Sequence, residues 1–460
     1  MTALLLAGCA VGPNYAAPKA PEFPAYATPS PGKATVTPAT AWWKAFNDPL
    51  LDRLVERAGI DNLTLLVALS RIDQARATRA GTNALFYPQV DSSAQASRRR
   101  SSGNATATPV TTGTRISESG SAGFDAAWEI DLFGRVRRSV EAADASLESF
   151  AAEADDARLT LIGDIATNYV ALRGNQRRLA IARETLKAQE DTAALTREKF
   201  AGGLVSRLDV TRAEGTARST AAGIPTLETA LRANFFRLGV LLGQAPGALL
   251  AELGPDQPIP TAELDPDAGI PAELARRRPD IRAAERTYAA NVAEIGVATA
   301  ALYPSFSIAG AIGINVATTD KITDPNSRTW SLGPSLSLPI FNAGRLRANV
   351  AVREASAEQS RLAYESTVLL AMEEVENALV AYGQERQRRD ELRVAAVNFR
   401  EAQSLAKDLY AQGLASFLEV LDADRSAYSA DDALATSEAR VATNLVALCK
   451  ALGGGWTVAR

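Results

Sequence analysis

The segment YAQGLASFLEVLDADR, residues 410–425, brings three carboxylates and one guanidinium together just after a glycine. These charged groups belong to Glu419, Asp422, Asp424 and Arg425. Grouped carboxylates can act as general acids and bases when their environments push their pKa values apart. The segment is therefore either a reactive loop or an architectural turn, and the rest of the sequence has to decide between the two.

Composition argues against catalysis. The chain of 460 residues contains no histidine and has a formal net charge of −4. The usual general base, the commonest metal ligand and the usual activator of serine or cysteine nucleophiles are thus missing. Glu373, Glu374 and Glu376 are interpreted as solvated or interhelical charges. We predict no enzyme, no cofactor or metal site and no nucleic-acid partner, since a basic footprint is lacking. The run Arg98, Arg99, Arg100 is interpreted as a solvated loop.

The two cysteines have different interpretations. Leu6, Ala7, Gly8 and Cys9 match a bacterial lipobox, which predicts a covalent lipid on Cys9; a chance cysteine is the alternative. Because a signal peptide needs a charged region and a longer apolar core, residues 1–9 are interpreted as a partial signal peptide. Ala10, which stands where an aspartate would retain the protein, favours delivery to the outer membrane. Cys449 is predicted to be a small buried hydrophobic residue.

The sequence predicts an extended, proline-rich tether over residues 10–41, followed by two similar halves. The first repeat, 42–245, contains a strand hairpin at about 90–131 and a long helix at about 135–200. A linker over 246–270 leads to the second repeat, 271–452. This repeat contains a hairpin at about 305–341 and a long helix at about 343–412, and a tail follows over 453–460. No run of 18 or more apolar residues predicts a transmembrane helix.

The duplication includes the acidic segment. Tyr87-Pro88 matches Tyr303-Pro304 at an offset of 216, and FAGGLVSRLDVTRAEG from Phe200 superposes on the acidic segment at an offset of 210. Each copy has a glycine where one helix ends and a serine where the next begins, as in a turn between antiparallel helices. A reactive loop would have little reason to occur twice, so we interpret the segment as architecture.

Dimensions predict an oligomer. Residues 135–200 would form a helix about 100 Å long, which needs a coiled-coil-like partner. Ile165, Leu172, Leu179, Leu186, Ala193 and Phe200 recur every seven residues, but Arg183 and Glu190 interrupt the complementary row, which favours a wall of helices. Four strands match a membrane crossing but cannot close a barrel, because single-chain barrels need at least about 8. Two or three chains must therefore form one barrel together, and the wide helical walls favour three chains.

The chain resembles the TolC-like outer-membrane factor family, in its NodT-type lipoprotein efflux-channel branch. Nine segments carry the resemblance in the family's order: CAVGPNY, WWKAFNDPLLDRLVERA, LFYPQV, DLFGRVRR, RRRPDIRAAE, LYPSFSI, FNAGR, FLEVLDADR and ALGGGW. The resemblance implies an α+β membrane protein: a homotrimer with a 12-stranded outer-membrane β-barrel, four strands from each chain, continuous with a 12-helix periplasmic tunnel.

The resemblance also implies a function. The family forms the exit channel of tripartite efflux systems and passively conducts small molecules such as drugs, toxic compounds or metal ions. Its partners are a periplasmic adaptor protein and an inner-membrane transporter, which we expect to be of the resistance-nodulation-division type, together with outer-membrane lipid. An exit duct for type I protein secretion is the alternative, and a structural coiled-coil stalk is the alternative outside the channel class.

The resemblance assigns a periplasmic gate to the acidic segment. Leu418 and Asp422 lie four residues apart, on one helix face, and correspond to positions that line the aperture of similar channels. Arg425 and Arg212 are expected to hold the gate closed, although an exposed ion pair between Asp422 and Arg425 is the plainer alternative. Adaptor docking is expected at the helical turns, on Gly203, Leu204, Val205, Ser206, Gly413, Leu414, Ala415 and Ser416.

Overall fold

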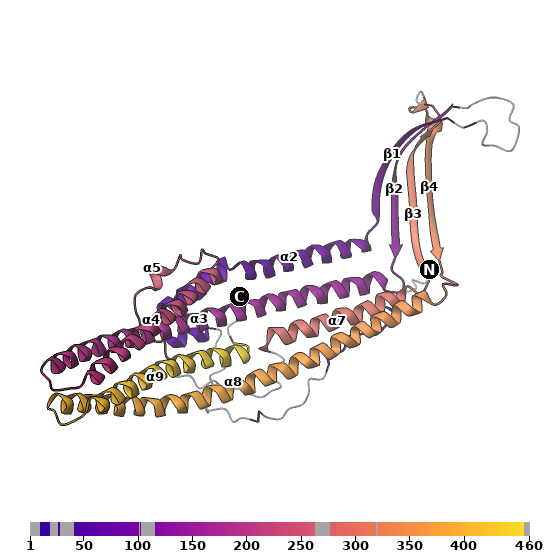
Figure 1. The fold of residues 1–460 in the computed structure, drawn as a ribbon. Helices are drawn as coiled ribbons and strands as arrows, with labels where there is room; N and C mark the ends of the chain where they lie inside the picture. The colour runs from indigo at the N-terminus through magenta and orange to yellow at the C-terminus, as the bar shows by residue number, and fades with distance from the viewer. Residues whose placement is uncertain are drawn as a thin grey trace. The chain divides into compact units, whose positions relative to one another are not determined.

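A computed structural model describes residues 10–18, 26–27, 41–100, 102, 116–262, 277–318 and 321–454. The chain, whose helices and strands Figure 1 shows, divides into two compact units. Unit 1 takes residues 1–19, 72–150 and 283–364, and unit 2 takes residues 20–71, 151–282 and 365–460, as far as these are described. The predicted lipidation site Cys9 and the tail from residue 455 lie outside the described residues.

Helices account for most of the described chain, and two of them have 67 residues each. A helix such as α1 begins where its sequence caps it: the Asp48 carboxylate accepts hydrogen bonds from Leu50 N and Leu51 N. The helices are η1 (Trp42–Phe46), α1 (Pro49–Asp61), α2 (Leu63–Asn83), η2 (Ala84–Phe86), α3 (Arg135–Ala201), α4 (Arg207–Leu241), α5 (Leu250–Leu253), α7 (Pro279–Ala300), η4 (Pro325–Ser327), α8 (Arg345–Ala411) and α9 (Phe417–Ala451). Among the described residues, no helix has both the length and the apolar character that crossing a membrane requires.

The seven-residue row of α3 forms part of the core of unit 2. Ile165 and Leu172 are 0% exposed and Ala193 is 2% exposed, whereas Phe200 at the helix end is 44% exposed. Residues from the predicted linker pack onto the same helix, because Arg173 donates hydrogen bonds to the carbonyl oxygens of Leu253 and Pro255. The spacing therefore marks a buried seam along α3 until its last turn.

Unit 1 contains one antiparallel sheet with the strand order β1-β2-β3-β4. The strands are β1 (Gln89–Arg100), β2 (Ile116–Ile130), β3 (Ser305–Val316) and β4 (Arg328–Ser337). The register places Phe124 opposite Ile312, and Ile312 opposite Trp330, so apolar side chains of neighbouring strands share one face. The other face carries small and polar residues, among them Ser93, Gln95, Ser121, Ser307 and Ser335. Strict alternation thus gives the sheet one apolar and one polar side.

Two predicted boundaries are wrong. Arg98, Arg99 and Arg100 are not a solvated loop but the last residues of β1, paired with Glu118, Ser117 and Ile116. Their pairing continues the ladder, which strand propensity alone did not reveal because arginine and serine are not typical strand residues. The second hairpin ends at Ser337 rather than at about residue 341. Leu338 and Pro339 follow outside the ladder, whereas Pro334 is tolerated within β4 because β4 is an edge strand.

Residues 10–18 of the predicted tether belong to unit 1 and are bonded to its other segments. Val11 N donates to the carbonyl oxygen of Phe133 at 3.1 Å, and Arg138 donates to Asn14 Oδ1 at 2.6 Å. A Cβ on Gly12 would lie 2.6 Å from the Gly296 Cα, so this close approach requires glycine. The tether therefore begins with a fixed segment beside the start of α3.

Candidate functional site

The predicted site residues lie on two helical tips of unit 2, the α3–α4 turn and the α8–α9 turn. At the first tip Gly203 has φ +73°, and at the second Gly413 has φ +77°. Leu204 N donates to the Lys199 carbonyl oxygen and Leu414 N donates to the Leu409 carbonyl oxygen, each at 2.9 Å. Both helices thus end in the same left-handed glycine motif, which satisfies carbonyl groups that the helix leaves free.

The first acidic residue of the segment 410–425 is an architectural one. The Glu419 carboxylate accepts a hydrogen bond from Ser416 N at 2.7 Å, and at the other tip the Asp209 carboxylate accepts one from Ser206 N at 3.1 Å. These are capping interactions, in which the third helical residue binds back to the residue before the helix. Ser206 and Ser416, predicted as docking residues, are therefore also the starting points of α4 and α9.

Asp424 is also structural, and sequence reasoning gave it no separate role. Its side chain is buried and accepts a hydrogen bond from Gln403 Nε2 at 2.8 Å. The same oxygen, Oδ1, lies 2.9 Å from Lys407 Nζ. Because both partners come from α8, the carboxylate ties α9 to α8 just above the turn. The signal was present in the repeat, since Arg197 and Glu214 occupy the matching positions and also form an ion pair.

Leu418 and Asp422 differ from these two acids because their side chains are exposed. Leu418 is 55% exposed, and Asp422 is exposed on the same face of α9. Within the part of the chain that the structure describes, no ion pair joins Asp422 to Arg425. The plainer alternative, an ion pair within one helix, is thus not the arrangement seen, and the Asp422 carboxylate faces away from the core of its own chain.

Arg212 and Arg425 lie together along a groove between α4 and α9. The groove has a volume of ≈ 420 Å³ and is open to solvent. The lining residues are Gln189, Arg212, Gly215, Thr216, Ser219, Thr220, Gly223, Leu421, Arg425 and Tyr428. The structure therefore brings together the two arginines that the sequence placed 213 residues apart, next to small and polar side chains of α4.

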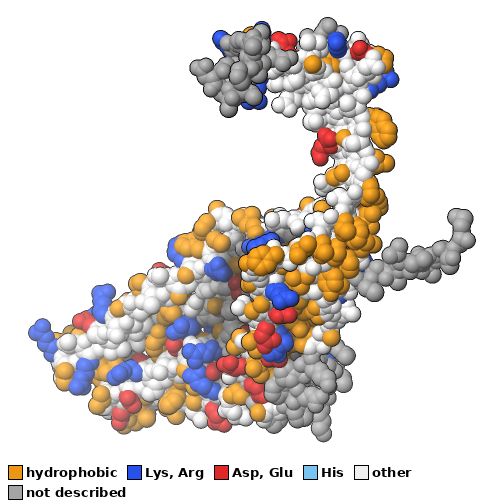
Figure 2. Space-filling view, turned by 90° about the vertical axis from the view of Figure 1, so that its right-hand side faces the viewer, with side chains coloured by type: hydrophobic (Ala, Val, Ile, Leu, Met, Phe, Trp, Pro, Cys, Tyr) orange, Lys and Arg blue, Asp and Glu red, His pale blue; other side chains and the backbone are white. Residues whose placement is uncertain are grey.

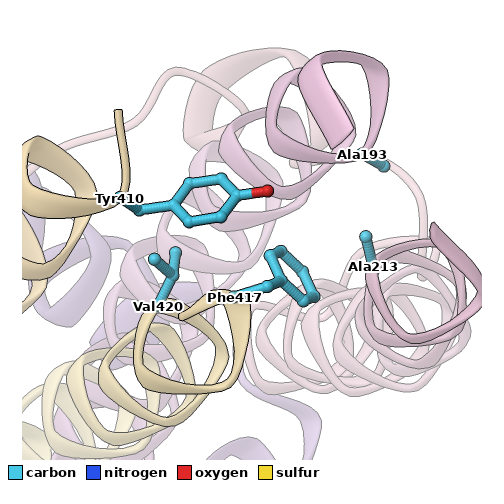
Figure 3. Packing of buried hydrophobic residues seen from close by; sticks show 5 residues of the cluster. All are labelled: Ala193, Ala213, Tyr410, Phe417 and Val420. Atoms are coloured by element: carbon cyan, nitrogen blue, oxygen red, sulfur yellow. The ribbon is translucent and has the colours of Figure 1, made fainter. Parts of the chain in front are cut away.

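A cluster of buried apolar residues joins the two tips (Figure 3). Tyr410 and Phe417 point between the helices toward Ala193 and Ala213, and their ring centroids are 5.8 Å apart. Lys199 Nζ lies 4.0 Å from the centre of the Tyr410 ring and donates to the Tyr410 carbonyl oxygen at 3.0 Å. Sequence reasoning missed this cluster, although aromatic residues at the end of α8 and the start of α9 were the available signal.

The predicted docking residues form the outermost part of each turn. Leu204 is 76% exposed and Leu414 is 73% exposed, while Val205 and Ala415 are half-buried. Each turn thus presents one large apolar side chain to solvent. Away from the tips, Cys449 is 1% exposed, as predicted, and burial raises the pKa of its thiol to about 12. Among the described residues, no group of three or more acidic, cysteine or histidine side chains could hold a metal ion.

Comparison with known proteins assigns a family. The sequence model described as outer membrane efflux protein matches residues 54–244 and 270–454. Nodulation protein T of Rhizobium leguminosarum bv. trifolii is 38% identical over 456 residues, which cover 98% of this chain and 96% of that protein. The solvent efflux pump outer membrane protein SrpC of Pseudomonas putida is 32% identical over 99% of this chain and 97% of its own length. The solved outer-membrane channel OprN superposes with a TM-score of 0.89 at 37% identity, over 97% of this chain and 100% of that one.

Proposed function

Because the chain belongs to the outer membrane efflux protein family, we propose that three copies close its sheet into a 12-stranded barrel that continues into a 12-helix tunnel. The chain is an outer-membrane efflux channel of a Gram-negative bacterium and extends into the periplasm. The family is a channel family rather than an enzyme family. A homotrimer accounts for the width of the helical walls and for a sheet that one chain leaves open.

The observation that carries the proposal is the sheet of unit 1. One face is apolar, with Phe124 and Ile312 more than half exposed, and the other is polar. β1 and β4 are edge strands whose outer backbone groups have no neighbour in the described sheet. In lipid every such group needs a partner, so the edges must pair with other copies. Apolar residues would then face lipid and polar residues would line a pore.

The transported molecules are proposed to be small. One relative with 32% identity, SrpC, is a solvent efflux pump protein, and the match covers 99% of this chain. Drugs, toxic compounds or metal ions are the proposed cargo, and protein secretion is the alternative. Because the sequence contains no phosphate-binding loop, the energy is proposed to come from an inner-membrane transporter of the resistance-nodulation-division type, joined through a periplasmic adaptor.

The gate is proposed to be formed by Leu418 and Asp422. Three copies around an axis would place a hydrophobic ring beside a carboxylate ring. The exposure of both side chains on one face supports this, since neither side chain makes a hydrogen bond or ion pair to any described residue of its own chain. Arg425 and Arg212, which share the groove between α4 and α9, are proposed to compensate the carboxylates and keep the aperture closed.

Single-channel recording in planar bilayers tests the gate. Asp422→Ala combined with Arg425→Ala is expected to raise the conductance, because the charges proposed to hold the aperture are removed. Asp408→Ala combined with Arg218→Ala is the matched control, since it removes one exposed carboxylate and one exposed guanidinium from the same unit. Unchanged conductance in the first variant, or an equal increase in the control, would remove the gate assignment. A stalk protein would give no conductance in any variant.

A lipid on Cys9 is proposed as a second membrane attachment. The supporting observation is the fixed segment 10–18: Val11 bonds to Phe133, two residues before the start of α3, and Ala10 lies against Gly134. Ala10, the residue after Cys9, thus lies beside the connection between β2 and α3. Anchoring by several acyl chains at this level is stable, unlike anchoring by one.

A further inference from the structure

The apolar face of the sheet ends in arginines. The register places Val90, Ser92, Ala94 and Ala96 of β1 on the same face as Phe124 and Trp128 of β2. Continuing the alternation puts Arg98 and Arg100 on this face, and the pairing of Arg328 with Ile314 adds a third arginine from β4. Figure 2 shows hydrophobic side chains along one side of the strand region, and basic side chains together with some acidic ones at its upper end.

All three arginines lie at the end of the sheet away from the helices. β1 follows α2 and β3 follows α7, whereas β2 leads into α3 and β4 leads into α8. The antiparallel register therefore gathers the four helix connections at one end and Arg100, Val316 and Arg328 at the other. Since the helices extend into the periplasm, the arginine end faces the outer leaflet of the outer membrane.

The spacing along the strand fits a membrane crossing. Trp128 lies near the helix end of β2, and Glu118, the partner of Arg98, lies ten positions away. Ten residues of antiparallel strand span about 34 Å. With a strand tilt of about 40° this becomes roughly 26 Å along the membrane normal, close to the apolar band of about 25 Å in outer-membrane barrels. A tryptophan at one interface therefore places Arg98 at the other.

We propose that Arg98, Arg100 and Arg328 bind the phosphate groups of anionic lipid headgroups in the outer leaflet. The inference rests on the proposed membrane position of the sheet. Guanidinium groups bind phosphate through two parallel hydrogen bonds, and long side chains at the edge of an apolar surface extend toward headgroups. Among the described strand residues of this face Glu118 is the one acid, and its carboxylate lies 3.3 Å from Arg98 Nε, where it orients one arginine.

Arg99 provides a control for the proposal, because it lies between Arg98 and Arg100 in the sequence but on the opposite, polar face of the sheet. It has the same charge, the same strand and nearly the same height, but it points toward the proposed pore. Lipid binding should therefore depend on which face carries the arginine and not on the total charge of the strand.

The test is native mass spectrometry of the purified full-length assembly in detergent, titrated with diphosphorylated lipid A. Arg98→Gln combined with Arg100→Gln is expected to weaken binding roughly 30-fold, because each basic group near a lipid surface contributes about a factor of five or six. Arg99→Gln should bind like the unchanged protein, and Glu118→Gln should bind more tightly. The unchanged protein should bind dephosphorylated lipid A as weakly as the double variant binds the phosphorylated form.

Three results would overturn the inference: wild-type binding by the double variant, equal loss in Arg99→Gln, or displacement of the lipid by millimolar inorganic phosphate, which would indicate a free-anion site. Conductance of the double variant in bilayers without phosphorylated glycolipid separates this inference from the proposed function. Channels of normal conductance show that the barrel forms, whatever the lipid result. Absence of channels in the unchanged protein would instead contradict the proposed function itself.

Discussion

At the first tip, between α3 and α4, Phe200 is 44% exposed, whereas its counterpart Tyr410 at the second tip is 6% exposed. The turns themselves are alike, with a left-handed glycine, an exposed leucine and a capping serine in each. At the start of the following helix the exposed Arg207 corresponds to the buried Phe417. Both copies have the same turn, which indicates that the turn is needed to connect the two antiparallel helices of each repeat. The two copies differ in burial: Tyr410 and Phe417 of the second tip are buried, whereas the corresponding Phe200 and Arg207 of the first tip are exposed.

The same contrast holds for the ion pairs that follow the turns. Arg197 and Glu214 at the first tip have half-exposed side chains, while Asp424 at the second tip is buried against Lys407 and Gln403. Further along, Arg212 corresponds to Asp422 at the offset of 210. The second tip is therefore the more deeply anchored one, and it presents the carboxylate. The exposed carboxylate proposed for the gate, that of Asp422, therefore lies two residues from the buried Asp424 that ties α9 to α8.

The largest expected difference concerns the aromatic pair. Phe417→Ala should lower the free energy of unfolding by about 3 kcal/mol, because it leaves a cavity beside Tyr410 and Val420. Phe200→Ala should lower it by less than about 1 kcal/mol, since this side chain is already in contact with water. Guanidinium titration of the purified protein in detergent gives both values. Phe417→Leu, which keeps most of the volume, should cost less than about 1.5 kcal/mol. Equal costs at both tips would show that Phe200 becomes buried in the assembly.

The buried ion pair gives the next largest difference. Asp424→Ala should cost about 2 kcal/mol, because Gln403 and Lys407 lose their acceptor in a partly buried place. Glu214→Ala should stay within about 0.5 kcal/mol, as is usual for an exposed pair with arginine. Asp424→Asn is the control, since an amide still accepts the bond from Gln403 and should recover part of the loss. A larger effect at Glu214 would reverse the comparison.

Much of the scaffold was predictable because it depends on local rules. The long helices, the glycine and serine of each turn and the four strands follow from periodicity and capping, which neighbouring residues determine. The end of β1 was not predictable in this way. Arg98, Arg99 and Arg100 have weak strand propensity, and only pairing with Glu118, Ser117 and Ile116 keeps them in the ladder.

For the candidate site, sequence predicted positions but not partners. Glu419 and Asp422 have the same charge and lie three residues apart, yet one caps its helix and the other is exposed. Asp424 looked like another member of an acidic group, and its role appeared only when α8 placed Lys407 beside it. The role of Asp424 depends on a contact between two helices, which local sequence patterns do not reveal, whereas the cap formed by Ser416 and Glu419 lies within one helix start.

The two glycines should behave alike. Gly203 and Gly413 both have positive φ, and a Cβ added to either would meet nothing within 4 Å. Alanine should therefore cost about 1 kcal/mol at each tip, purely from the left-handed backbone. Asparagine, which tolerates this conformation better, should cost less at both positions. Thermal unfolding of the four variants would show it. A clear difference between the tips would mean that one glycine also makes a close contact in the assembly.

The smallest effects on stability are expected at Leu204 and Leu414, the leucines proposed to bind the periplasmic adaptor. Leu204→Ala and Leu414→Ala should each change the free energy of unfolding by less than about 0.5 kcal/mol, because both side chains are mostly in water. Together they should abolish crosslinking to the periplasmic adaptor while trimers still form, since an apolar anchor contributes to binding only when a partner covers it. Leu195→Ala, 42% exposed on α3 and two turns before the tip, is the matched control and should leave crosslinking intact. If only one of the tip leucines matters, the adaptor distinguishes the two repeats; if neither does, docking lies elsewhere on the helices.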